Sequence, residues 1–334
     1  MLAGLIAVIA LTLFFEFING MHDSANSIAT IVSTKRLSPR KAVAFGAILN
    51  ILGAFAGTHV AKTIGAGIVD SDIINLTVVF CAIMGAISWN IFTWYIGIPS
   101  SSSHALIGGL MGAATAQSGL SVVHFTQVCE KVLIPMVVSP VMGIVFGFLI
   151  MLGLIWLCCH QTPTRVNRKV RRCQLLSSGL MAFAHGSNDA QKSMGIITLA
   201  LFTHGHLDSI DVPGWVIISC ALCMGLGTMA GGWRIIRTMG SKMFKLRPVH
   251  GLAADTASAS VILMASHLGI PVSTTHIIAS SIMGVGSTRG ISAVRWGIVG
   301  QIVQAWIFTV PICMGLSYFY YHLAHFVLHS INFD

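Results

Sequence analysis

Charged residues are scarce in this 334-residue chain. They make up 9% of it, with 10 acidic side chains against 19 Lys and Arg. Soluble domains carry roughly 25% charged residues, so the composition excludes an ordinary soluble protein. Hydrophobic residues form 55% of the sequence, and apolar runs recur along its whole length. Runs of about 20 apolar residues are typical of membrane-crossing helices. The composition therefore predicts an all-α polytopic membrane protein.

Other features are missing as well. Segments of about 10 residues with alternating polarity, typical of a membrane β-barrel, are absent from the sequence. Cys220 and Cys223 have metal-like spacing but no second cysteine pair, so we interpret them as packing residues. The first 19 residues lack a basic start and contain Glu16, which argues against a removable signal peptide. With this apolar content, the net charge of +9 indicates basic cytoplasmic loops and no nucleic-acid partner.

Two polar motifs occur twice in the same order. The stretch 20–27 reads GMHDSANS and 186–193 reads GSNDAQKS, while 97–104 reads GIPSSSSH and 269–276 reads GIPVSTTH. All four lie inside apolar sequence. Polar groups doubled in a membrane chain are typical of a transporter with one central site between two repeats.

The loops predict the topology. Basic clusters lie at 35–41, 165–172, 242–247 and 289–295, whereas acidic loops contain Asp70 with Asp72 and Asp208 with Asp211. Placing every basic cluster in the cytoplasm gives a consistent alternation, with both termini outside. The expected spans are 2–33, 42–64, 75–97, 98–117 and 127–157, followed by 174–202, 213–236, 250–268, 271–287 and 296–322.

Five spans in each unit make the repeats inverted. We expect a first inverted repeat at 1–157, a basic cytoplasmic linker at 158–173, formed as a loop, and a second inverted repeat at 174–334. The total is 10–12 membrane segments, some of them broken or re-entrant. We expect the long segment 2–33 to be broken, and the upper count applies if the long first segments are re-entrant hairpins.

Asp23 and Asp189 lie deep in apolar sequence at equivalent positions of the two repeats. An unpaired charge at membrane depth costs about 2.5–3.5 kcal/mol on insertion scales. Each carboxylate therefore needs a bound cation, a proton or an internal partner, which makes the two aspartates candidate coupling-ion residues. The alternative is that they cap broken helices, and the two roles can coexist.

The Pro-Ser/Thr motifs indicate an anion site. Proline suits the first turn of a helix, where free backbone N–H groups and a partial positive charge favour phosphate or carboxylate. Two such termini facing each other would hold a tetrahedral oxyanion through neutral donors. The alternative is that the hydroxyls bond back to their own helices. The candidate hydroxyls are Ser101, Ser102, Ser103, Ser273, Thr274 and Thr275.

The sequence does not decide the roles of three other polar residues. His104 and His276 end the two hydroxyl runs, and either proton transfer or hydrogen-bonded packing fits them. Glu16 is an intramembrane carboxyl without a counterpart in the second repeat. The sequence does not assign it a function.

The duplicated motifs resemble those of a known transporter family. Over nearly its whole length, the chain resembles the PiT-type inorganic phosphate transporter family, through the stretches 20–26, 183–189 and 271–276. The resemblance implies secondary-active uptake of inorganic phosphate. Carried over by position, the core set is Asp23, Asn26, Asn188, Asp189, Ser101, Ser102, Ser273 and Thr274. To the phosphate-binding residues we add Ser103, Thr275, Gln191 and Lys192.

Departures from the family pattern concern the coupling ion. His22 and Lys192 stand where sodium-coupled relatives carry Asn, and Asn50 stands where they carry Glu. A lysine is a tethered cation that can take the electrostatic place of sodium. The pattern resembles the bacterial proton-coupled branch, and this resemblance implies that phosphate is carried largely as a neutral metal–phosphate complex. We therefore expect a proton-coupled symporter that works by alternating access. A sodium-coupled symporter or a sulfate transporter of the same architecture remains the alternative.

An enzyme is not expected, because a membrane phosphatase or transferase needs a nucleophile with a base or a full metal-ligand set. We also expect no cofactor. The resemblance implies a multi-pass protein of the inner membrane whose partners are phosphate, a coupling cation and the bilayer. The sequence leaves open the metal preference and the oligomeric state, with a homodimer among the states considered.

Overall fold

The computed structural model describes residues 2–64 and 74–331, and within these residues it contains helices and loops but no strand. Asp70 and Asp72 of the first acidic loop lie outside the described residues. The α-helices are α1 Leu2–Ser33, α2 Pro39–Ala54, α3 His59–Ile64, α4 Leu76–Ile96, α5 Ser102–Ser118, α6 Phe125–Val128, α7 Ile134–Cys158, α8 Pro163–Thr203, α9 Gly214–Ala230, α10 Trp233–Arg237, α11 Pro248–His267, α12 Thr274–Ser287 and α13 Trp296–Ile331. Two π-helical segments, Cys129–Leu133 and Thr238–Lys242, precede α7 and follow α10.

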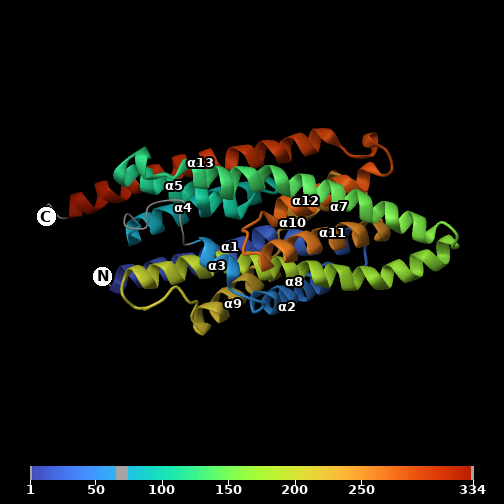
Figure 1. Cartoon of the computed structure of the whole chain (residues 1–334), viewed down its shortest axis with the longest axis horizontal. Coiled ribbons are helices and arrows are strands. Elements are labelled where there is room, and N and C mark those ends of the chain that lie inside the picture. The colour runs from blue at the N-terminus through green and yellow to red at the C-terminus, as the bar shows by residue number, and fades with distance from the viewer. Residues whose placement is uncertain (1, 65–73, 332–334) are drawn as a thin grey trace.

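The helices form an elongated bundle with both termini at one end and the α7–α8 connection at the other (Figure 1). The segments 35–41, 165–172, 242–247 and 289–295 all lie toward the α7–α8 end. The four basic clusters predicted to share one side of the membrane are therefore at the same end of the molecule. Which end faces the cytoplasm stays a prediction.

Four of the described helical segments are long and apolar enough to cross a membrane: Leu2–Ser33, Leu76–Ile96, Phe125–Cys158 and Trp296–Val327. Helix α9 passes the same test together with the segment Trp233–Lys242, which includes α10, and the 62° bend between them marks a broken span or a re-entrant loop. Helix α8 is longer than any of these but fails the test, because the polar motif and its basic first turns lower its hydropathy. Its polar half is buried among other helices, so it does not need an apolar surface.

Helices α5 and α12 are too short to cross a bilayer. Their 17 and 14 residues reach about 25 Å and 21 Å at 1.5 Å per residue, whereas the hydrocarbon core is about 30 Å thick. Each is the second arm of a hairpin: α4–α5 lies toward the end with the termini, and α11–α12 toward the α7–α8 end (Figure 1). Glycines in the left-handed region turn both tips, Gly97 with φ 77° and Gly269 with φ 68°. The prediction of 98–117 and 271–287 as separate full spans was wrong for this reason.

Two further expectations need correction. Helix α1 is continuous through its polar motif, because polar side chains leave the backbone hydrogen bonds intact and no proline interrupts them. Helix α8 begins at Pro163, so most of the expected 158–173 loop is helical. The chain breaks instead at 55–58, between α2 and α3, and at Gly231, between α9 and α10.

Close helix contacts repeat between the two halves. A Cβ on Gly20 of α1 would lie 2.3 Å from the carbonyl oxygen of Met224 in α9, and one on Gly186 of α8 would lie 2.1 Å from that of Asn50 in α2. Gly20 and Gly186 occupy the same position of the duplicated motif, so α1 meets α9 as α8 meets α2. Small residues allow such close packing in membranes. The contacts support two interlocked repeats, although the boundaries at 157 and 174 stay predictions.

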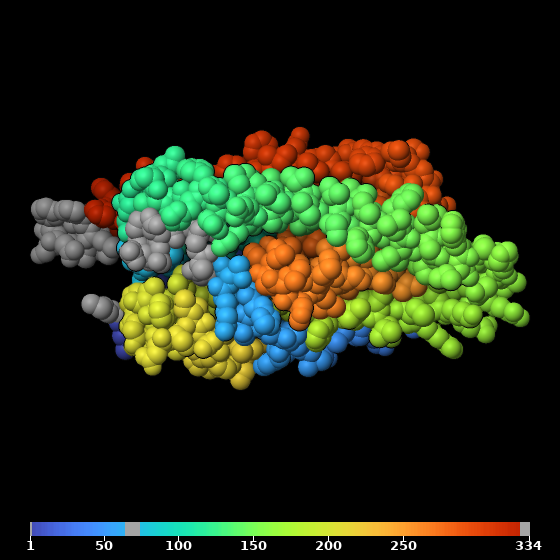
Figure 2. Space-filling view, in the orientation of Figure 1, coloured from blue at the N-terminus to red at the C-terminus, as the bar shows by residue number. Residues whose placement is uncertain are grey.

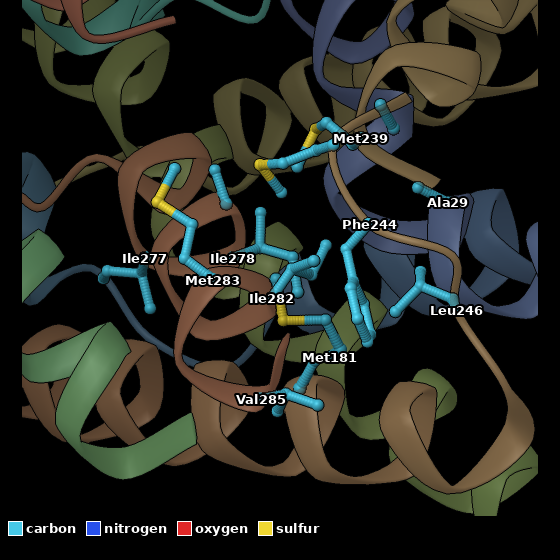
Figure 3. Close-up of a cluster of buried hydrophobic side chains, with 14 of the residues drawn as sticks. Ala29, Met181, Met239, Phe244, Leu246, Ile277, Ile278, Ile282, Met283 and Val285 are labelled. Carbon is cyan, nitrogen blue, oxygen red and sulfur yellow. The ribbon is translucent and has the colours of Figure 1, made fainter. Parts of the chain in front are cut away.

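A large apolar cluster packs along α12. Figure 3 shows Met181 of α8, Met239 of the π-helical segment after α10, Phe244, and Ile278 and Ile282 of α12 converging on one another. Unbranched methionine side chains fill irregular gaps of this kind. This cluster therefore packs α12 against side chains from several other segments, including α8 and the residues after α10.

The short helix α3 lies on the outer face of the bundle, beside the hairpin of α11 and α12 (Figure 2). The rings of His59 in α3 and His267 in α11 lie 6.3 Å apart. Lys62 Nζ lies 2.7 Å from Asp211 Oδ1, with both side chains largely exposed. The hydrogen bond from Lys62 lowers the pKa of the Asp211 carboxyl below its usual value. An exposed pair of this kind adds little stability.

Candidate functional site

Four segments from the two repeats meet in the interior of the bundle. Asp23 of α1 and Asp189 of α8 are both buried there, with exposed fractions of 2% and 0%. The α4–α5 and α11–α12 hairpins lie toward opposite ends of the molecule (Figure 1). Their hydroxyl motifs, at the tips, contact Asp23 and Asp189. Both pairs of duplicated motifs therefore lie in one place.

Asp23 is held by hydroxyls from both hairpins. Its Oδ2 accepts a hydrogen bond from Ser102 Oγ of α5 at 3.1 Å, and its Oδ1 accepts one from Thr275 Oγ1 of α12 at 3.2 Å. Oδ1 also lies 2.8 Å from Nδ1 of the preceding His22. The carboxylate thus links α1 to the first turns of two other helices.

Asp189 has a cationic partner. Lys192, one turn later on α8, places its Nζ 2.6 Å from Oδ1, and Lys192 is itself only 1% exposed. Thr274 of α12 donates to Oδ2 at 3.1 Å, and His185 Nε2 lies 3.3 Å from the same oxygen. Lys192 therefore compensates the charge of Asp189 directly, which gives this carboxylate an internal partner of the kind expected for a buried charge.

The starts of α5 and α12 have the same geometry. Ser101 and Ser273 are their N-caps, and the Oγ of each accepts a hydrogen bond from the backbone N–H three residues later, at 3.3 Å in both. Pro99 precedes the first cap by two residues, as Pro271 does the second, so the prolines do not occupy the first turn as expected. The positive ends of both helix dipoles therefore lie beside Asp23 and Asp189, where they favour negative charge.

Asn26 joins α1 to the start of α12. Its Nδ2 donates to Thr275 Oγ1 at 2.8 Å and to Thr274 Oγ1 at 3.3 Å. Within the described residues, the buried atoms Asn26 Oδ1 and Ser103 Oγ have no hydrogen-bond partner. These two atoms can bond a ligand without breaking an internal contact.

Two residues predicted to bind phosphate have other partners. Gln191 Oε1 accepts hydrogen bonds from the backbone N–H groups of Val60 and Ala61, at the start of α3. Two residues along a helix correspond to about 200°, so Gln191 points away from the face of Asp189. Asn188 pairs with Ser266 Oγ of α11 at 3.0 Å. With its amide nitrogen on the other side, Asn188 also donates to the Val272 carbonyl oxygen at 3.2 Å and to Asp189 Oδ1 at 3.3 Å.

Sequence reasoning missed His185 as a site residue, and it named Asn50 only because sodium-coupled relatives carry Glu there. His185 Nδ1 lies 3.2 Å from Asn50 Oδ1 and 3.2 Å from Ser27 Oγ, and these contacts hold the ring toward Asp189. His185 precedes Asp189 by one helical turn, which is the signal that could have identified it. Asp23, His185 and Asp189 each offer a metal-ligand atom, and the three atoms lie within 4.8 Å of one another.

His104 and His276 contact each other where the two repeats meet. Their ring centroids are 4.9 Å apart in an edge-on arrangement, and the His276 ring stacks on Trp306 of α13 at 4.0 Å. Both histidines are buried. The rings pack against each other, but neither nitrogen of His276 and not Nδ1 of His104 has a hydrogen-bond partner within the described residues, so these contacts do not decide between the two roles left open by the sequence.

A small cavity adjoins the site. It has a volume of about 40 Å³ and is lined by Thr63, Ser103, Lys192 and Pro271 among mainly apolar side chains. Its walls come from both repeats. The site is therefore largely filled by its own side chains, and a bound anion must replace some of their mutual hydrogen bonds.

Comparisons with known proteins agree on one family. Residues 19–317 match the model of the Phosphate transporter family. The chain is 50% identical over 325 residues to a probable low-affinity inorganic phosphate transporter of Rhizobium meliloti, covering 97% of each protein. It is 43% identical over 329 residues to a Bacillus subtilis protein of the same description, covering 98% of this chain and 97% of that protein.

A solved structure has the same fold. The sodium-dependent phosphate transporter superposes with a TM-score of 0.85, at 24% sequence identity, covering 97% of this chain and 100% of that one. At this identity the similarity establishes the helical architecture alone.

Proposed function

This chain belongs to the phosphate transporter family, a family of transporters and not of enzymes, and from that premise we propose that it imports inorganic phosphate by proton-coupled symport. The observation that carries the choice of coupling ion is the 2.6 Å contact between Lys192 Nζ and Asp189 Oδ1 in the buried centre of the molecule. A fixed ammonium there takes the electrostatic place of a bound sodium.

Neutral donors are proposed to hold the phosphate oxygens. Ser102, Ser103, Thr274 and Thr275 lie at the starts of α5 and α12, whose dipoles favour an anion. Asn26 and Lys192 add an amide and an ammonium. Because the hydroxyls of Ser102, Thr274 and Thr275 already donate to Asp23 or Asp189, bound phosphate would exchange these hydrogen bonds for its own. Ser101 and Ser273 contribute by capping the two helices.

The two aspartates favour phosphate over sulfate. A hydrogen phosphate carries a proton that it can donate to a carboxylate, whereas sulfate at neutral pH has none. Asp23 and Asp189 remain as acceptors beside the hydroxyl motifs. A sulfate ion would meet two carboxylates without a donor of its own, which is costly in a buried site.

Phosphate can also enter with a divalent metal. Asp23, His185 and Asp189 supply two carboxylate oxygens and an imidazole nitrogen within 4.8 Å of one another. Divalent metals accept such ligands. A metal–phosphate complex would reduce the repulsion between the anion and the two carboxylates, so we include it as a form of the substrate.

Alternating access is proposed to use the two hairpins. The α4–α5 and α11–α12 hairpins lie toward opposite ends of the bundle and both contact the aspartates at their tips (Figure 1). Movement of one hairpin relative to α1 and α8 would open the site to one side at a time. We place the protein in the inner membrane with both termini outside, as the basic clusters at the α7–α8 end suggest.

Uptake of labelled phosphate into proteoliposomes tests the proposal. We expect an inward proton gradient to drive accumulation, a sodium gradient alone to have no effect, and excess sulfate not to compete. Accumulation driven by sodium alone would favour the sodium-coupled alternative. Adding Mg²⁺ or a chelator to the same assay separates free phosphate from a metal–phosphate complex as the substrate.

A further inference from the structure

Glu16 is a buried carboxyl on α1 that the phosphate site does not use. Its side chain is 0% exposed, and it lies seven residues before Asp23, about two turns nearer the N-terminal end of α1. Oε2 accepts a hydrogen bond from Ser193 Oγ of α8 at 2.5 Å. Oε1 has no hydrogen-bond partner in the part of the chain that the structure describes. An ionised carboxyl with an unsolvated oxygen is costly in such a place, and holding a proton removes that charge.

The titratable groups around Glu16 come from two helices. Lys192 and Asp189 lie within electrostatic range on α8, and Cys220 and Cys223 on α9. The ammonium of Lys192 is 2.6 Å from Asp189 Oδ1, so Lys192 is already paired with Asp189. Glu16 is therefore close to a cation that another carboxylate holds.

When the stretches 16–27 and 182–193 are aligned, Glu16 and Lys192 are the two charged residues without a charged counterpart. Seven residues before Asp189, where the second repeat would carry the equivalent of Glu16, it has Ala182. Three residues after Asp23, where the first repeat would carry the equivalent of Lys192, it has Asn26. The two unmatched charges lie near each other across the contact between α1 and α8. Glu16 and Lys192 therefore form an acid–base pair that the pseudo-symmetry of the two repeats does not explain. This asymmetry indicates a function distinct from holding phosphate.

We propose that Glu16 carries the coupling proton, in a unit with Ser193 and Lys192. The proposal rests on the proton coupling put forward above and adds the residue that performs it. Glu16 takes up a proton from water on the side of the termini and releases it to the opposite side after the transporter changes conformation. The proton moves from water to the carboxyl and back to water, and no other bond forms or breaks.

Lys192 links this proton to the phosphate site. When Glu16 gives up its proton, its carboxylate competes with Asp189 for the ammonium of Lys192. Asp189 then presents more negative charge to the bound anion, and phosphate binding weakens. A protonated Glu16 leaves Lys192 with Asp189 and supports binding. The two ligands therefore favour each other, as symport requires.

Two transport assays on Glu16→Gln test the assignment. Glutamine keeps the size of the side chain but cannot release a proton. Exchange of labelled for unlabelled phosphate without a gradient needs no net proton movement, so we expect it to persist. Accumulation driven by an inward proton gradient should be lost. With one coupled proton, a difference of one pH unit supports about tenfold accumulation in the wild type, and the variant should show none.

Matched variants make the outcome specific. Glu130→Gln removes an exposed carboxyl and should accumulate phosphate like the wild type. Glu16→Asp keeps a titratable group and should recover part of the accumulation if Glu16→Gln is poorly folded. Full proton-driven accumulation by Glu16→Gln overturns the assignment, and so does equal loss of exchange and accumulation in folded protein. If the wild type itself does not respond to a proton gradient, the proposed proton coupling fails first.

Discussion

Thr275, in the first turn of α12, donates a hydrogen bond to Asp23 of α1 across 3.2 Å. The two residues come from opposite repeats and stand 252 positions apart in the chain. The same hydroxyl accepts a hydrogen bond from Asn26 at 2.8 Å. A single threonine thus connects the α11–α12 hairpin to the helix that carries the first aspartate. Any movement of the hairpin relative to α1 must break this contact.

Thr275→Val should lower phosphate uptake while the protein stays folded. Valine has the same shape but no hydroxyl, and a hydrogen bond to a charged group contributes about 1.5–3 kcal/mol. We expect about a tenfold loss of uptake or more. Thr288→Val at the other end of the same helix removes a hydroxyl that bonds its own backbone at Val285, and it should stay close to the wild type. Equal uptake by the two variants would contradict a role for Thr275 in the site.

Ser101→Ala and Ser273→Ala should destabilise the protein by similar amounts. Both serines cap a helix with the same 3.3 Å contact, and loss of such a cap costs about 0.5–2 kcal/mol. Thermal unfolding in detergent measures the loss, with Ser260→Ala as an exposed control on α11. The double variant should insert and fold but no longer bind phosphate. Wild-type uptake by the double variant would show that the capped termini do not form the anion site.

The duplicated motifs made the centre of the site predictable. Asp23 and Asp189 contact the hydroxyls of the repeated Ser/Thr motifs, and Lys192 reaches Asp189 because three residues along a helix share a face. Gln191 was assigned to the site from its position in the motif. Its place two residues from Asp189 turns it toward α3. Helical phase alone could have excluded it.

Contacts between distant segments could not be predicted from one sequence. Asp255 of α11 was missed: its Oδ2 accepts hydrogen bonds from Thr30 of α1 at 2.8 Å and Ser178 of α8 at 2.5 Å. No repeated motif marks any of these three residues. The break expected within 2–33 and the loop expected at 158–173 were wrong, because hydropathy registers polar side chains and cannot tell whether the backbone stays helical around them.

Gly20→Ala and Gly186→Ala should both reduce the yield of folded protein. The added methyl group would lie 2.3 Å or 2.1 Å from a backbone carbonyl oxygen on the facing helix, which cannot move without shifting that helix. Gly153→Ala in α7, where no described atom lies within 4 Å of the new methyl group, should be neutral or stabilising by about 0.5–1 kcal/mol. Size-exclusion profiles of the three variants in detergent measure the effect. A normal profile for Gly20→Ala would mean that α1 and α9 are less tightly packed than described.

Lys192→Asn should change both the rate of transport and its ion dependence. Removing the ammonium leaves Asp189 buried without its cation, and breaking a buried ion pair in this way costs about 3–5 kcal/mol. Asparagine is the residue that the first repeat carries at this position, as Asn26, and its oxygen can bind a cation. We therefore expect proton-driven uptake to fall about tenfold or more, and sodium to restore part of it by neutralising Asp189. Lys169→Gln, an exposed position on the same helix, serves as the control and should transport normally. Uptake by each protein is measured with and without sodium under the same proton gradient. If Lys192→Asn keeps the rate and proton dependence of the wild type, the ammonium does not stand in for a bound cation.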